Sequence, residues 1–114
     1  MSDPSIPLTT GEYSEWGNPE IKEEFEYILR YSPYDNIDKL EYPSILVTAG
    51  LWDSQVQYYE PAKYVAKLRD YNQSDNPIIM KVNISAGHSG NSGRFESLKE
   101  VAMEYAFLLR VDSN

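Results

Sequence analysis

Apolar residues in the first third of the chain recur at helical spacing and predict one helix. Asn18 and Pro19 suit an N-cap and a first helical turn. The apolar positions that follow lie on one helical face, at Ile21, Phe25, Ile28 and Leu29. Ser32-Pro33 is expected to end the helix, because the residue before a proline avoids helical torsion angles. Residues 1–19 carry several prolines and glycines and are expected to be irregular.

The middle of the chain changes from helical spacing to a short continuous apolar run. Residues 44–49, closed by Gly50, predict a strand buried on both faces, as in a parallel sheet. Glu60-Pro61 then opens a second helix, which we expect to turn Val65 and Leu68 inward. A polar turn is predicted over residues 72–76.

The last third predicts one more strand and one more helix. In the strand, one face carries Ile78, Met80, Val82 and Ile84, and polar side chains alternate on the other, which is typical of a half-exposed strand. The final helix is predicted to be long and amphipathic, with its apolar positions at Phe95, Leu98, Val101, Ala102, Tyr105, Leu108 and Leu109. The order strand, helix, strand, helix favours an α/β fold with parallel strands. Two strands make a poor sheet, so we expect the sheet to be incomplete.

Charge and composition narrow the range of functions. The net charge is −8, and residues 1–42 hold ten acidic and three basic side chains, a net charge of −7. This balance argues against nucleic-acid binding, which needs basic patches. An acidic front third could attract cationic ligands, but composition alone favours the simpler interpretation, a solvated helix face. With no cysteine there is no disulfide or thiolate zinc site, which suits a reducing cytoplasm. No membrane span or signal pattern is present in the sequence.

Asp53 and His88 are the candidate catalytic residues. Each follows an apolar run that ends in a glycine loop, and His88, the single histidine, comes 35 residues after Asp53. An acid and then a histidine after successive strands match the last two members of the triad order serine, aspartate, histidine. An imidazole can take the proton of a hydroxyl nucleophile and return it to the leaving amine, while a carboxylate orients the ring.

Simpler interpretations of both residues remain open. A lone histidine is usually a surface or packing residue, and an aspartate after a strand often caps a helix or closes a turn on its own backbone. No nucleophile precedes Asp53 in this chain. Residues 87–91 nearly spell a nucleophile elbow around Ser89, but no histidine follows that serine.

An acidic loop at residues 9–17 offers a third candidate site. Its carboxylates, Glu12 among them, lie beside aromatic residues and could bind a guanidinium or ammonium group. Solvated acids near a packed tryptophan are the simpler alternative. No residues have metal-ligand spacing, so we expect neither metal nor cofactor.

Taken together, several segments closely resemble the oligopeptidase B branch of the prolyl oligopeptidase family of serine peptidases. The similarity runs over nearly the whole chain, and no single motif carries it. The segments concerned are residues 3–12, 15–19, 31–36, 50–58, 60–63, 85–88 and 92–95.

The resemblance implies that residues 1–114 form the C-terminal portion of an α/β-hydrolase domain, without the nucleophile serine and the β-propeller that precede it in the family. It implies a cytoplasmic peptidase that cuts short basic peptides after Arg or Lys. Asp53 and His88 fall on the family's catalytic aspartate and histidine, and Glu12 on an acid of the pocket for the basic side chain. The implied partners are the peptide substrate and the remainder of the peptidase, with neither nucleic acid nor membrane.

Two residues depart from the family pattern. Ser14 stands where bacterial relatives often have a second pocket acid, which affects the strength of the basic preference. Trp52 stands where relatives usually have histidine. Because the nucleophile is absent, we expect this chain to be inactive alone. Two alternatives remain: a non-catalytic acidic module that binds cationic peptides, and a truncated fragment with no function of its own.

Overall fold

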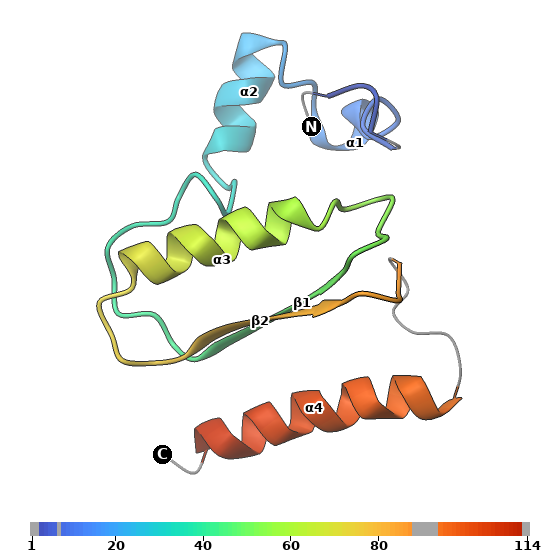
Figure 1. Ribbon diagram of the computed structural model, residues 1–114. Helices are drawn as coiled ribbons and strands as arrows, with labels where there is room; N and C mark the ends of the chain where they lie inside the picture. Colours follow the sequence, from blue (N-terminus) through green and yellow to red (C-terminus); the bar gives the residue numbers. More distant parts are fainter. Residues whose placement is uncertain (1–2, 7, 88–93, 113–114) are drawn as a thin grey trace. The chain divides into compact units, whose positions relative to one another are not determined.

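The computed structural model describes residues 3–6, 8–87 and 94–112, which form two units, Met1–Asp38 and Lys39–Asn114. The first unit holds the helices α1 (Tyr13–Trp16) and α2 (Lys22–Leu29). The second holds the strands β1 (Ile45–Gly50) and β2 (Ile78–Asn83) and the helices α3 (Tyr59–Tyr71) and α4 (Arg94–Asp112). Figure 1 shows this order along the chain.

Helix α1 is a short helix in the segment that the sequence predicted to be irregular. Its start is fixed by the backbone, because the carbonyl of Glu12 accepts the N–H groups of Glu15 and Trp16. It ends at Gly17, whose φ of 99° lies in the left-handed region that suits glycine.

Helix α2 confirms the predicted helix but begins later than expected, and its apolar positions are not buried: Phe25 and Leu29 are exposed and Ile28 is half-buried. The prediction of Asn18 as N-cap was wrong, since Ile21 occupies that position. The side chain of Asn18 instead accepts the N–H of Glu20 at 3.0 Å, in a turn that precedes the helix. The helix ends before Ser32-Pro33, as predicted, and the amide of Asn36 donates to the carbonyls of Leu29 and Ser32, both at 2.8 Å.

In the second unit, β1 and β2 form a two-stranded parallel sheet. The register pairs Ile45 with Ile78 at the start and Gly50 with Asn83 at the end. Helix α3 packs on this sheet and buries Val65 and Leu68, as the sequence predicted. The polar turn after α3 is also confirmed: Asn72 accepts the N–H groups of Tyr42 and Ser74, both at 3.1 Å.

The prediction that the first strand is buried on both faces was wrong for this chain. In β1 only Gly50 is buried, and Thr48 is exposed. On the same face of β2, Ile79 and Lys81 are exposed, because α3 covers only the opposite face of a sheet with two strands. The expected incomplete sheet is therefore what the structure shows.

Two further details differ from the predicted pattern. Ile84 lies outside β2 and is 73% exposed, because the strand ends one residue earlier. In α4 the predicted apolar positions are exposed, whereas the half-buried residues form a different stripe: Glu100, Met103, Phe107 and Val111. Figure 1 shows α4 along the face of the sheet opposite to α3.

Candidate active site

The candidate site lies where the two parallel strands end. Gly50 closes β1 and Asn83 closes β2, and the two are paired in register. Asp53 follows β1 after two residues, and the segment 84–87 follows β2 and leads in the sequence to His88. Since parallel strands present their carboxyl ends at one edge, both loops leave the sheet at the same place.

Backbone hydrogen bonds hold these two loops together. The N–H of Leu51 donates to the carbonyl of Asn83 at 2.8 Å, and the N–H of Trp52 donates to the carbonyl of Ala86 at 3.2 Å. A third bond joins the indole Nε1–H of Trp52 to the carbonyl of Ile84 at 2.9 Å. The loop that carries Asp53 is thus joined to the last residue of β2 and, at two further points, to the segment that precedes His88.

Gly50 permits this close approach. A Cβ atom added there would lie 2.7 Å from the carbonyl oxygens of both Ala86 and Gly87. Such a distance is far inside van der Waals contact, and both atoms belong to the backbone, so neither can turn away. A glycine at the end of β1 is therefore a steric requirement for the contact between the loops.

Asp53 is half-buried, and its carboxylate holds the turn in which it lies. Its Oδ1 accepts the N–H groups of Gln55 and Val56, both at 2.8 Å. The turn-forming aspartate considered as the simpler interpretation is thus present in the structure. It does not conflict with the catalytic interpretation, since these two bonds fix the direction of the carboxylate.

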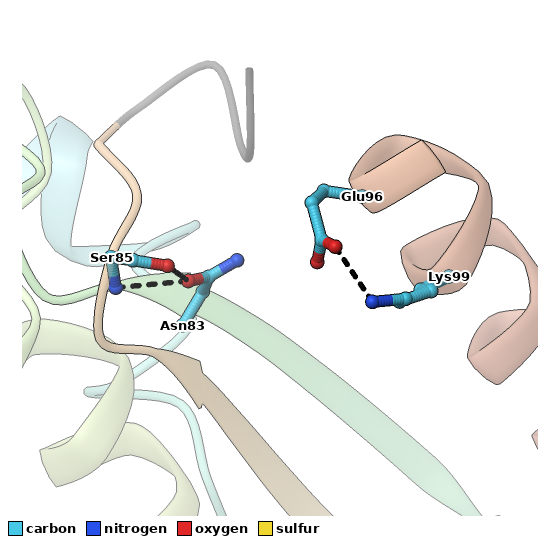
Figure 2. Close-up of polar contacts among 4 residues, drawn as sticks. All are labelled: Asn83, Ser85, Glu96 and Lys99. Atoms are coloured by element: carbon cyan, nitrogen blue, oxygen red, sulfur yellow. Dashed lines mark hydrogen bonds and ion pairs between the residues drawn. The ribbon is translucent and has the colours of Figure 1, made fainter. Parts of the chain in front are cut away.

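On the other strand, Asn83 shapes the chain after β2. Its Oδ1 accepts the N–H and the hydroxyl of Ser85, both at 3.0 Å (Figure 2). Its Nδ2 donates to Oε1 of Glu100 on α4 at 2.6 Å. Figure 2 also shows the neighbouring ion pair of α4, in which Lys99 Nζ lies 2.6 Å from Glu96 Oε1.

A cavity of about 850 Å³ opens between the strand ends and α4. Asp53, Asn83 and Gly87 line it on the side of the sheet, and Glu96, Glu100 and Glu104 line it on the side of α4. Asp53 therefore borders a space large enough for further protein groups or a small ligand.

Two of the predicted site residues are not placed relative to Asp53. His88 lies outside the described residues. Glu12 is half-buried at the start of α1, in the unit Met1–Asp38, and each unit is described by itself. Within the described ranges no group of three His, Cys, Asp or Glu side chains could hold a metal ion, and no helix there is long and apolar enough to cross a membrane.

Sequence reasoning missed three residues that build this site. Gly50 carried a signal, because a glycine that closes an apolar run marks a close backbone approach. Asn83 and Trp52 carried none, since their partners lie 17 and 32 residues away in the sequence.

Comparison with known proteins places the chain among peptidases. The model of the prolyl oligopeptidase family matches residues 1–113. Dipeptidyl aminopeptidase BI of Pseudoxanthomonas mexicana is 59% identical over 96% of this chain, and Protease 2 of Moraxella lacunata is 51% identical over 96%. The chain spans only 15% and 16% of the length of these two relatives.

Solved structures agree with the sequence comparison. Oligopeptidase B from Leishmania major matches with a TM-score of 0.93 and 46% identity, over 96% of this chain and 15% of that one. Prolyl oligopeptidase B from Galerina marginata matches with a TM-score of 0.82 and 30% identity, over 90% of this chain and 15% of that one. The structures of that enzyme include variants in which a serine, an aspartate or a histidine, in this chain order, is replaced by alanine.

These matches confirm the predicted fold class, the C-terminal portion of an α/β-hydrolase fold, and the resemblance to oligopeptidase B. The chain belongs to the prolyl oligopeptidase family.

Proposed function

We propose that this chain is the C-terminal segment of a serine peptidase and supplies two members of its catalytic triad, Asp53 and His88. One observation carries the proposal: the segment that ends at Gly87 is bonded to the loop of Asp53, so the residue before His88 lies beside that loop. The serine, aspartate and histidine replaced in the Galerina marginata enzyme support the same three residue types in the same order.

The chemistry follows from what each group can hold or move. The imidazole of His88 takes the proton of a serine hydroxyl as that oxygen attacks the peptide carbonyl, and returns it to the leaving amine. Asp53 accepts a hydrogen bond from the other ring nitrogen, fixes the tautomer and stabilises the imidazolium. Its Oδ1 accepts two backbone N–H groups that hold the turn, and we assign the hydrogen bond from His88 to the same carboxylate.

The serine comes from the part of the peptidase upstream of this chain, together with the β-propeller that restricts access to short peptides. Without that serine the covalent route is lost, so the chain alone is inactive. We place the complete enzyme in the cytoplasm, and the lack of cysteine in this chain is compatible with that compartment.

For specificity, we propose that Glu12 binds the guanidinium or ammonium group of a substrate Arg or Lys. A carboxylate and a guanidinium form a charge-assisted, bidentate pair, which neutral side chains cannot replace. Ser14 is a neutral hydroxyl two residues later, so Glu12 would act without a second acid at that position.

A second candidate function concerns which bond is cut. A relative 59% identical to this chain is named a dipeptidyl aminopeptidase, which favours release of dipeptides from a free amino terminus. An oligopeptidase would cut equally well when that terminus is blocked. Paired substrates, identical except for an N-terminal blocking group, separate the two activities.

The test uses the full-length peptidase and substrates with arginine or a neutral residue before the scissile bond. We expect His88→Ala to lower kcat by about 10³-fold or more, because the general base is lost. Glu12→Gln should lower kcat/KM for the arginine substrate by about 10–100-fold, the scale of one charge-assisted bond.

Two results would contradict the proposal. A His88→Ala enzyme that keeps its rate would remove the catalytic assignment. Equal losses on both substrates in Glu12→Gln would make Glu12 a scaffold residue. Binding of basic peptides by this chain alone, with no activity in the full-length protein, would favour the non-catalytic acidic module.

A further inference from the structure

Trp52 has an exposed ring and yet makes a specific contact far along the chain. Trp52 is 72% exposed. The Nε1–H of its indole ring donates to the carbonyl of Ile84, 32 residues later, at 2.9 Å. Burial of the ring therefore contributes little at this position. The hydrogen bond joins the Trp52 side chain to the backbone of Ile84, after β2.

The acceptor lies on the segment that leads to His88. Ile84 is the first residue after β2, and the backbone N–H of Trp52 also donates to Ala86 on the same segment, at 3.2 Å. Gly87 comes close to Trp52 as well, because a Cβ added at Gly87 would lie 3.3 Å from the Trp52 carbonyl oxygen. Trp52 thus lies against three of the four residues that precede His88.

On its other side, Trp52 is bonded through its own peptide group to Asp53. A displacement of the Trp52 backbone therefore moves the carboxylate of Asp53, and a displacement of Ile84 moves the segment before His88. We propose that Trp52 is a positioning residue, whose indole N–H holds the Asp53 loop against residues 84–87, the segment that leads in the sequence to His88. This inference rests on the proposed catalytic role of Asp53 and His88.

The expected signature is a loss in kcat at nearly constant KM. Trp52 donates to the backbone of a neighbouring loop, and the substrate contact proposed above belongs to Glu12. A misaligned carboxylate stabilises the imidazolium less well, so the acidic limb of the pH–rate profile should move to lower pH. A purely structural role for the ring would change stability without this shift.

The experiment compares two variants of Trp52 in the full-length peptidase. Trp52→Phe keeps an aromatic ring but removes the N–H, whereas Trp52→His keeps a ring N–H, as in the relatives that the sequence resembles. Tyr105→Phe is the matched control, since it removes one hydroxyl from an aromatic residue on α4 that is 63% exposed. For each enzyme, kcat and KM are measured across pH, together with the urea midpoint of unfolding.

We expect Trp52→Phe to lower kcat by about 3- to 10-fold, the scale of one hydrogen bond, with the acidic limb shifted to lower pH. Trp52→His should recover most of the rate, and Tyr105→Phe should match the unchanged enzyme. Equal losses in Trp52→Phe and Trp52→His, an unshifted profile, or a fall in the unfolding midpoint that accounts for the lost rate would each overturn the inference.

Failure of the inference is distinct from failure of the proposed function. If His88→Ala and Asp53→Asn lose activity while Trp52→Phe does not, only the positioning role of Trp52 falls. If His88→Ala stays active, the catalytic pair itself is wrong, and the role of Trp52 falls with it.

Discussion

The strand ends and helix α4 differ in what holds them in place. At the strand ends, backbone groups make the contacts: Leu51 donates to the carbonyl of the last residue of β2, Trp52 donates to that of Ala86, and Gly50 lets the two loops touch. Along α4, a side-chain bond joins Asn83 of β2 to Glu100. The apolar residues of α4 that the sequence singled out are exposed.

The contacts at the strand ends are made within this chain. The surroundings of α4, in contrast, depend on contacts with other protein. Backbone hydrogen bonds between parallel strand ends need only the two strands. An apolar helix face needs something to cover it, and large uncovered apolar patches mark contact surfaces. The candidate catalytic loop is therefore the self-contained region, and α4 is the region whose environment is incomplete in this chain.

The largest effect should come from removing charge at the strand ends. In the full-length peptidase, Asp53→Asn should lower kcat by about 10³–10⁴-fold, because the amide keeps an oxygen for the turn but selects the wrong imidazole tautomer. Steady-state kinetics check this result. Asp112→Asn makes the same charge change on α4 at a residue outside the lining of the cavity, and it should leave kcat unchanged; a comparable loss there would break the contrast between the regions.

A smaller effect, on stability, is expected from a side chain at Gly50, where the two loops touch. Gly50→Ala places a methyl group against two carbonyl oxygens and should cost about 1–3 kcal/mol of unfolding free energy. Urea denaturation measures it. Gly11→Ala is the control, because a Cβ there would lie 3.5 Å from its nearest neighbour, an ordinary contact. Equal stability of the two variants would mean that the loops separate freely.

Next comes the hydrogen bond from Asn83 to Glu100, which links the two regions. Asn83→Asp replaces the donor to Glu100 with a second carboxylate and should cost about 1 kcal/mol, more at high pH than near pH 4. The check is urea denaturation at both pH values. Glu96→Gln breaks only an exposed pair with Lys99 and should change stability by less than about 0.5 kcal/mol. A pH-independent loss in Asn83→Asp would contradict a charge effect.

The smallest stability effect is predicted for the exposed face of α4. In the isolated chain, Leu98→Gln with Leu108→Gln should alter unfolding free energy by less than about 0.5 kcal/mol, because both side chains are already exposed. The same change should reduce self-association, which size-exclusion chromatography detects. A large loss of stability would show that this face is packed within the chain.

The sequence predicts where helices and strands lie better than it predicts which of their faces are buried. The stripe of Val65 and Leu68 was recognisable because both neighbours, the helix and the sheet, belong to this chain. The covered stripe of α4 was not, since residues such as Phe95 and Leu109 are apolar whether or not a partner is present. At the site, the position of Asp53 in a loop after a strand was predictable from the residues around it. The bond from Trp52 to Ile84 was not predictable, because it depends on how the two strands are paired.

We propose that Asp53 and His88 form an acid–base pair at the carboxyl end of the sheet. A crystal structure of the full-length peptidase tests this pair most directly, through the distance between the nearer carboxylate oxygen of Asp53 and the nearer ring nitrogen of His88. We expect a hydrogen bond of about 2.6–3.2 Å. A His88 ring turned away from the Asp53 loop, with another group bonded to that carboxylate, would contradict it.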